Sequence, residues 1–102
     1  MDHFGEYVRR LLDARGWTIS HWARMVGIAQ GFASNVVSGR RTPPLDAIDL
    51  WADSFALTGD ERLRFIDLAA VSHLPKRSQA RFLAVIDEQA RMKAELAGYG
   101  RS

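Results

Sequence analysis

The sequence predicts an all-α fold of six helices, and three observations lead to this prediction. Apolar residues recur at intervals of three and four along several segments, which is the period of an amphipathic helix. Ser and Thr residues stand where helices would begin, and their hydroxyls can accept hydrogen bonds from first-turn amides. Glycines and prolines stand where helices would end. The 102 residues have the length of one domain.

The first helix is predicted from Phe4 to Arg15. Its apolar stripe consists of Phe4, Val8, Leu11 and Leu12. Gly16 follows and ends the helix, because glycine adopts a positive φ at low cost. Trp17 leads into the next segment, and we expect its large apolar ring in the core.

The stretch from Thr18 to Gly39 predicts two short helices joined by a tight turn. Thr18 is a suitable N-cap for a helix from about Ile19 to Val26, which Gly27 would end. A second helix would start near Ala29 or Gln30 and stop at Gly39. Two short helices joined by a turn containing glycine are typical of the helix-turn-helix motif, whose second helix enters the major groove of DNA.

The two faces of this stretch differ in polarity. The positions expected to be buried are Trp22, Ala23, Met25, Val26, Ile28, Ala33 and Val36. The second helix keeps a polar face, which contains Gln30, Gly31, Ser34, Asn35 and Ser38. Gln and Asn side chains can form two hydrogen bonds with adenine, at N6 and N7. This face therefore predicts contact with base edges.

Charge is distributed unevenly along the chain. Residues 18–45 contain Arg24, Arg40 and Arg41 but no Asp or Glu, as a segment that binds phosphates requires. Residues 46–67 contain six acidic side chains and two arginines. This pattern indicates one face toward DNA and another turned away, although clusters of this kind are also typical of solvated helix faces.

Residues at fixed spacing identify a family resemblance. Thr18, Ala23, Gly27 and Gly39 stand in the register of the lambda-repressor-like (XRE) family of helix-turn-helix regulators, which the stretch resembles. Residues 40–43, Arg-Arg-Thr-Pro, are similar to the basic residues, polar residue and proline that usually follow in that family. The resemblance covers roughly residues 4–75.

The resemblance implies a fold and a function. Residues 1–74 would form a lambda-repressor-like five-helix DNA-binding domain, and residues 75–102 an additional C-terminal helix for packing or dimerisation. The protein would be a sequence-specific, double-stranded DNA-binding transcriptional regulator, in our expectation a repressor, with helix 30–38 in the major groove. It would bind a palindromic operator as a homodimer, with half-sites about 34 Å apart or a multiple of that.

The resemblance also implies roles for individual residues. Gln30 and Asn35 match the family's base-contacting positions, and Gly31 and Ser34 complete the set expected at the bases, with Ser34 at a base or a sugar. The residues expected at phosphates are Thr18, Ser20, His21, Ser38, Arg40 and Arg41.

Two departures from the family pattern bear on these roles. Ile19 replaces a Gln that is frequent in the family, so the phosphate contact of that Gln is lost or moves to Ser20 or His21. Ala29 offers no cap to the recognition helix. Phe32 can contact a thymine methyl or pack inside the protein, and the sequence leaves both open.

The fourth and fifth helices follow a loop that contains Pro43 and Pro44. The fourth is predicted from Leu45 to Phe55, and its apolar stripe is Leu45, Ile48, Trp51, Ala52 and Phe55. Its outer carboxylates, Asp46, Asp49 and Asp53, predict a solvated face rather than a metal site. A capping box at Thr58–Glu61 begins the fifth helix, which runs to about His73. The apolar members of this helix are Leu63, Ile66, Leu68, Ala70 and Val71.

The last helix is predicted from Gln79 to Ala97, with Ser78 as its cap and Gly98 at its end. Its stripe is Phe82, Val85, Ile86, Gln89, Met92, Lys93 and Leu96. About two heptads are too few for a standalone coiled coil, so we expect this helix to pack on the domain, on a sister subunit, or on both. Residues 98–102 are expected to form a frayed tail.

Several classes of function find no support in the sequence. The chain contains no cysteine, which excludes disulfides, thiolate catalysis and Cys-based zinc sites. His3, His21 and His73 lack the spacing of metal ligands. No nucleophile–base pair or phosphate loop is visible, so we expect neither an enzyme nor a cofactor. Without a membrane-length apolar run or a signal-peptide core, we expect a soluble, cytoplasmic protein.

An alternative function is a protein-interaction module, such as an antitoxin or an accessory subunit, on the same helix-turn-helix fold. Ala29 and Gly31 weaken the recognition helix, and the C-terminal helix has an apolar stripe that a protein partner could cover.

Overall fold

The computed structural model describes residues 3–99, and every regular element in that range is helical, so the all-α prediction is confirmed. The elements are α1 (Phe4–Arg15), α2 (Ile19–Val26), α3 (Gln30–Ser38), the short 3-10 helix η1 (Leu45–Ala47), α4 (Ile48–Ser54), α5 (Gly59–Ser72) and α6 (Lys76–Tyr99). Across these residues, no helix has the length and apolar character needed to cross a bilayer.

The ends of the first three helices lie where the sequence predicts them. The hydroxyl oxygen of Thr18 accepts a hydrogen bond of 3.0 Å from the amide of His21 at the start of α2. Gly16, Gly27 and Gly39 have φ angles of 66°, 73° and 86° at the ends of α1, α2 and α3. These left-handed conformations favour glycine, and they explain why each helix stops there.

The core lies where α1, α2, α3, α4 and α5 meet, and aromatic rings fill its centre. The Trp22 ring stacks on Phe55 at 5.5 Å between ring centroids and meets the Trp51 ring edge-on at 5.0 Å. Its indole nitrogen donates a 3.0 Å hydrogen bond to Ser54. These contacts connect α2 to α4 and thereby hold the helix-turn-helix pair against the rest of the domain.

A glycine lies at the contact between α1 and α3. A Cβ atom added to Gly5 would lie 2.2 Å from the carbonyl oxygen of Val37 and 2.8 Å from that of Val36, so only glycine fits there. The sequence pattern did not predict this contact. An isolated glycine inside a helical pattern was the available signal for a close backbone approach. The contact fixes α3 against α1.

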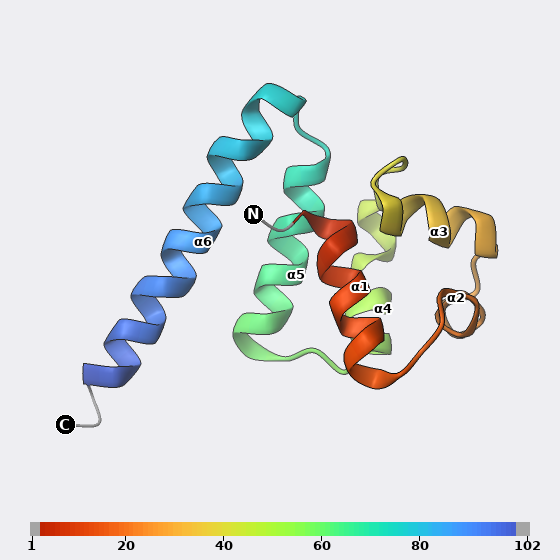
Figure 1. The fold of residues 1–102 in the computed structure, drawn as a ribbon, viewed down its shortest axis with the longest axis horizontal. Helices are drawn as coiled ribbons and strands as arrows, with labels where there is room; N and C mark the ends of the chain where they lie inside the picture. The colour runs from red at the N-terminus through yellow and green to blue at the C-terminus, as the bar shows by residue number, and fades with distance from the viewer. Residues whose placement is uncertain (1–2, 100–102) are drawn as a thin grey trace.

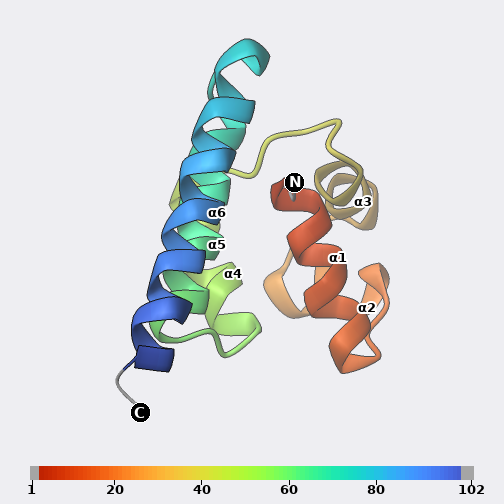
Figure 2. The ribbon, with the colours of Figure 1, turned by 60° about the vertical axis from the view of Figure 1, so that its left-hand side comes forward.

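The two ends of the molecule have different roles in the architecture. Figure 1 shows α2 and α3 at one end of the long axis and α6 at the other, with α5 between α6 and the helices of the core. Figure 2 shows α6 running alongside α5 from a second direction. The molecule measures 47 × 31 × 21 Å along its principal axes. The C-terminal part of α6 is thus far from the helix-turn-helix pair, whereas its first turns line a groove together with the end of α3.

Before α5, two residues predicted to be buried are exposed. Met25 is at the edge of α2, because the buried residues of that helix, Trp22, Ala23 and Val26, define a stripe that Met25 does not share. Leu45 is exposed because a 3-10 turn precedes α4, and this turn rotates its side chain out of the stripe that begins at Ile48.

The prediction for α5 is partly wrong. Thr58 precedes the helix but accepts no side-chain hydrogen bond, because Gly59 has a φ of 58° and the first turn does not have capping-box geometry. Leu63 and Ala70 are exposed, whereas Phe65 and Ala69 are fully buried. The stripe is displaced because α5 packs on the core with one side and faces α6 with the other.

The last helix is longer than predicted. It begins at Lys76 instead of Gln79, because the carbonyl of Pro75 accepts hydrogen bonds from the amides of Ser78 at 2.9 Å and Gln79 at 3.2 Å. Proline is tolerated before or within a first helical turn. Helix α6 also continues through Gly98 to Tyr99, so the predicted end at Gly98 is wrong. The rest of the expected frayed tail, residues 100–102, lies outside the described residues.

Candidate nucleic-acid interface

Helix α3 exposes the four residues that the sequence analysis assigns to base contacts. Gln30, Gly31 and Ser34 are exposed, and Asn35 is half-buried beside them. Residues at these intervals share one side of a helix. The opposite side contains the buried residues Ala33, Val36 and Val37. The structure therefore brings the four predicted residues together on one surface.

The carbonyl oxygen of Asn35 organises the end of α3. It accepts hydrogen bonds from the amides of Arg40 at 2.9 Å and Arg41 at 3.1 Å, and from the hydroxyl of Ser38 at 3.1 Å. Gly39 makes this turn possible through its left-handed conformation. The backbone of the two arginines is thus held at a fixed position relative to Asn35. The Ser38 hydroxyl proton is already engaged and must leave this carbonyl to reach a phosphate.

The cationic side chains of this region extend into solvent. Arg24, Arg40 and Arg41 are exposed, and none of them forms an ion pair with another described residue. Arg40 and Arg41 line a groove of about 660 Å³ together with His3 and Lys76. Unpaired, solvated guanidinium groups are suited to phosphate oxygens, because no carboxylate competes for their donors.

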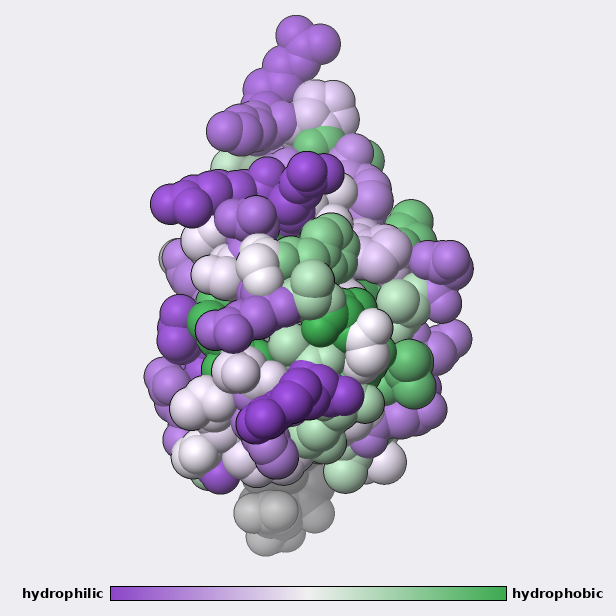
Figure 3. All heavy atoms as spheres, turned by 90° about the vertical axis from the view of Figure 1, so that its right-hand side faces the viewer, coloured by the Kyte–Doolittle hydropathy of each residue, from purple (hydrophilic) through white to green (hydrophobic). Residues whose placement is uncertain are grey.

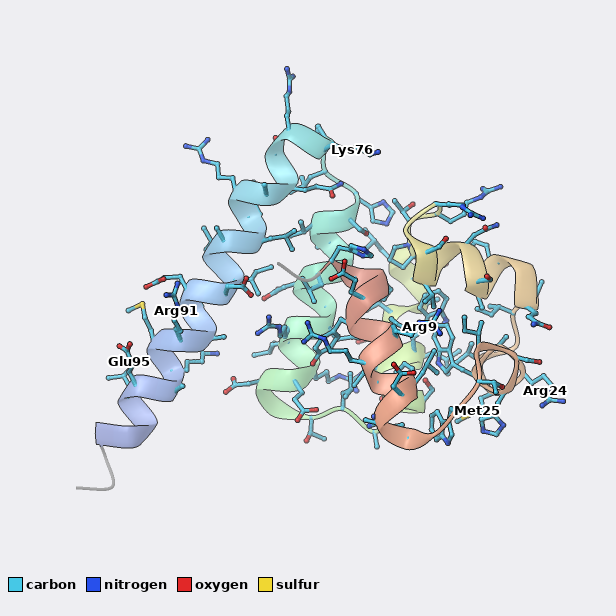
Figure 4. All side chains as sticks on the ribbon, viewed as in Figure 1. Arg9, Arg24, Met25, Lys76, Arg91 and Glu95 are labelled. Carbon is cyan, nitrogen blue, oxygen red and sulfur yellow. The ribbon has the colours of Figure 1, made fainter. Side chains whose placement is uncertain are left out.

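Arg24 was predicted only as part of a segment suited to phosphates, and Lys76 was not predicted near this surface. Arg24 is in the last turn of α2 and points outward at the edge of the molecule, as does the neighbouring Met25 (Figure 4). Lys76 lies at the start of α6 and reaches the groove beside the α3–η1 loop. The lack of acidic neighbours was the signal for Arg24, whereas only the fold brings Lys76 near the other cations.

The start of α2 groups the three other residues predicted at phosphates. The hydroxyl of Thr18 accepts the His21 amide, so its own proton remains available for donation. The His21 ring lies 5.4 Å from the Trp17 ring, centroid to centroid, and is thereby oriented. Ser20 is half-buried in the same turn. First-turn amides and the positive end of the helix dipole favour an anion here.

Two aromatic residues near this surface, Trp17 and Phe32, pack inward. Trp17 stacks on Phe55 at 5.9 Å between ring centroids, so the expectation of a core role is confirmed. Phe32 is half-buried and packs against the core cluster, which favours the packing alternative over contact with a thymine methyl. No side-chain hydrogen bond caps α3 at Ala29, as expected.

The acidic segment belongs to other elements. Arg62 of α5 donates hydrogen bonds to Asp53 at 2.8 Å and Asp49 at 3.3 Å, both from α4. The hydrogen bond to Asp53 raises the pKa of the Arg62 guanidinium above its usual value. These two carboxylates of α4 are thereby paired with Arg62 of α5 instead of facing α3. Within residues 3–99, no three His, Asp or Glu side chains are grouped as metal ligands.

Figure 3 shows the end of the molecule formed by α2, α3 and the loop after α3. Weakly polar and apolar side chains (white and green) occupy much of its middle, and strongly hydrophilic ones (purple) lie around and between them. Comparisons of this chain with protein-family models, curated proteins and solved structures found no match.

Proposed function

We propose that this protein is a sequence-specific, double-stranded DNA-binding transcriptional regulator that inserts α3 in the major groove. In this proposal residues 1–74 form a lambda-repressor-like domain, and the protein represses by occupying a palindromic operator. The observation that supports it is the exposed polar face of α3 between unpaired arginines, in a segment without a single carboxylate.

The role proposed for each residue follows from the chemistry of its side chain. Gln30 and Asn35 offer a donor and an acceptor to base edges, while Gly31 leaves room for close approach and Ser34 reaches a base or sugar. Arg40 and Arg41 neutralise phosphates and fix the register of α3, with Thr18, Ser20, His21 and Ser38 as further donors to phosphate. Arg24, at the end of α2, contributes a further phosphate contact.

The proposal is tested by selection from a pool of randomised duplexes at several salt concentrations, followed by sequencing of the retained DNA. We expect enrichment of a symmetric site and an affinity that falls steeply as salt rises, because phosphate contacts release counterions. Retention without enrichment would contradict base recognition by Gln30 and Asn35 and would leave charge-driven binding alone.

The same selection distinguishes the alternative of a protein-interaction module, such as an antitoxin or accessory subunit. Exposed apolar residues on α6 favour this alternative, because a protein partner could cover them. A module of that kind would bind a partner protein tightly and retain no duplex even at low salt. Failure to retain any duplex would therefore overturn the regulator and favour the module.

A further inference from the structure

Helix α6 is held on the domain by one of its sides. Leu83 and Ile86 pack against the core cluster. Gln79 donates a 2.8 Å hydrogen bond to the carbonyl of Leu74. Asp87 and Lys93 form ion pairs of 2.8 and 2.9 Å with Arg64 and Asp60 of α5, respectively. This inner side fixes the orientation of α6, so whatever its other sides expose is presented by a positioned helix.

A second apolar row lies on a different side of α6 and has no cover. The side chains of Phe82, Val85, Met92 and Leu96 are 48, 50, 54 and 70% exposed. Together with Gln89 they form the outer stripe, residues 82, 85, 89, 92 and 96. The intervals alternate between three and four residues, which is the spacing of a coiled-coil seam. Isolated exposed apolar residues are ordinary, but a continuous row at this period indicates a helical partner.

We propose that the outer stripe binds the outer stripe of a second copy of this chain, with the two α6 helices parallel and in register. In this pairing each apolar residue of the stripe meets the same residue of the partner. Gln89 meets the partner's Gln89 in the middle of the seam, where two amides can hydrogen-bond each other. A single polar residue at such a position specifies register and orientation in coiled coils.

The charges that flank the outer stripe agree with a parallel pair. Glu88 directly precedes Gln89 of the outer stripe, and Lys93, five residues after Glu88, directly follows Met92. In a parallel coiled coil, these two positions face each other across the seam. Glu88 therefore lies opposite the partner's Lys93, and the symmetry repeats this attraction on the other side. The ammonium group of Lys93 has three donors, so it can keep its bond to Asp60.

Antiparallel pairing is disfavoured by the same residues. Two antiparallel alignments keep most of the outer stripe in contact. One brings Glu88 opposite the partner's Glu88 but also Arg81 opposite the partner's Glu95, and the other brings Glu88 opposite the partner's Glu95. Charge therefore rejects the second alignment, and the central amide decides against the first. Each alignment also places Gln89 against an apolar residue, Val85 or Met92 of the partner. A buried amide without a hydrogen-bonding partner costs free energy.

The parallel pair is compatible with the proposed function. The position of DNA on the dimer rests on that function, whereas the pairing of the two helices does not. A two-fold axis along α6 brings the Lys76 ends of both copies to the same end of the dimer. Lys76 lines the groove that also contains Arg40 and Arg41, so both grooves then face one side. A palindromic duplex has a matching two-fold axis perpendicular to its length.

The first test measures the mass of the full-length protein by sedimentation velocity over a wide range of concentrations. We expect a dimer, and we expect Val85→Glu or Met92→Glu to give a monomer with unchanged helix content by circular dichroism. Ala84→Glu is the matched control, because Ala84 is exposed on α6 outside the outer stripe, and it should remain dimeric. A wild-type monomer at every concentration, or equal loss of dimer in the control, would overturn the proposal.

The second test fixes orientation, and the lack of natural cysteine makes it direct. Val85→Cys and Met92→Cys should each form a disulfide-linked dimer under mild oxidation. In the parallel register, each of these residues lies beside the same residue of the second chain. Ala84→Cys should not. Cross-linking only between a Val85→Cys chain and a Met92→Cys chain would refute the parallel register. Asn35→Ala should leave all of these results unchanged, so loss of DNA binding and loss of the dimer are separable.

Discussion

At the scale of single residues, Asn35 contributes two groups to the proposed interface. Its side-chain amide lies on the exposed face of α3, and its backbone carbonyl holds the amides of Arg40 and Arg41. Substitution of the side chain leaves the carbonyl in place. The contribution of the side chain to base recognition can therefore be separated from the contribution of the backbone carbonyl to the loop.

We predict that Asn35→Ala weakens binding to the selected operator by about 1–3 kcal/mol and reduces discrimination at one base pair, since a base contact is lost. Gln30→Ala should behave similarly. Arg41→Ala should instead weaken binding to every sequence and reduce the salt slope by about one, because it removes a phosphate contact. Titrations on operator and unrelated duplexes measure both effects. An equal loss on all sequences for Asn35→Ala would show that it does not read a base.

At the scale of elements, the position of α3 depends on its contact with α1 at Gly5. We predict that Gly5→Ala destabilises the fold by about 1–3 kcal/mol or more, because the added methyl meets backbone carbonyls that cannot move independently. Urea unfolding followed by circular dichroism measures the change. DNA binding should also weaken wherever the variant remains folded, since α3 must shift.

Gly31→Ala is the matched control for this prediction. Gly31 is also a helical glycine, but a Cβ there meets no atom within 4 Å. Alanine should stabilise α3 by up to about 1 kcal/mol, since glycine is the poorer helix former. Opposite signs for the two substitutions would locate the α1–α3 contact at Gly5. Equal destabilisation by both would mean that α3 is more tightly enclosed than its exposed face indicates.

The elements also show what sequence alone determines. Thr18 and Gly27 were predicted correctly because a cap and a left-handed glycine act within a few residues of their own position. Leu63 and Met25 were assigned wrongly because their burial depends on which neighbour packs on each helix. Gly5 was overlooked for the same reason. The predicted base-contacting residues do share one face, but the approach of Lys76 to the loop required the tertiary fold.

At the scale of the whole molecule, α3 and the C-terminal part of α6 occupy opposite ends of the long axis (Figure 1). The proposed dimer therefore buries the end that lacks the DNA-binding face and leaves both α3 helices outermost. Each chain extends 47 Å along its longest axis, so the two recognition helices cannot approach as closely as in a dimer joined beside α3. This arrangement therefore favours a larger multiple of the duplex turn than the single turn that the family resemblance implied first.

We predict that the operator has half-sites whose centres are two duplex turns apart, about 68 Å or 20–21 base pairs, because the spacing must be a multiple of one turn. Wild-type protein should bind this spacing more tightly than a single half-site. Removal of about five base pairs should abolish the gain, since half a turn puts the half-sites on opposite sides of the duplex. The Met92→Glu variant should bind every spacing with the affinity of one half-site. Preference of the wild type for half-sites one turn apart would show that the DNA-bound dimer is joined through a surface other than α6.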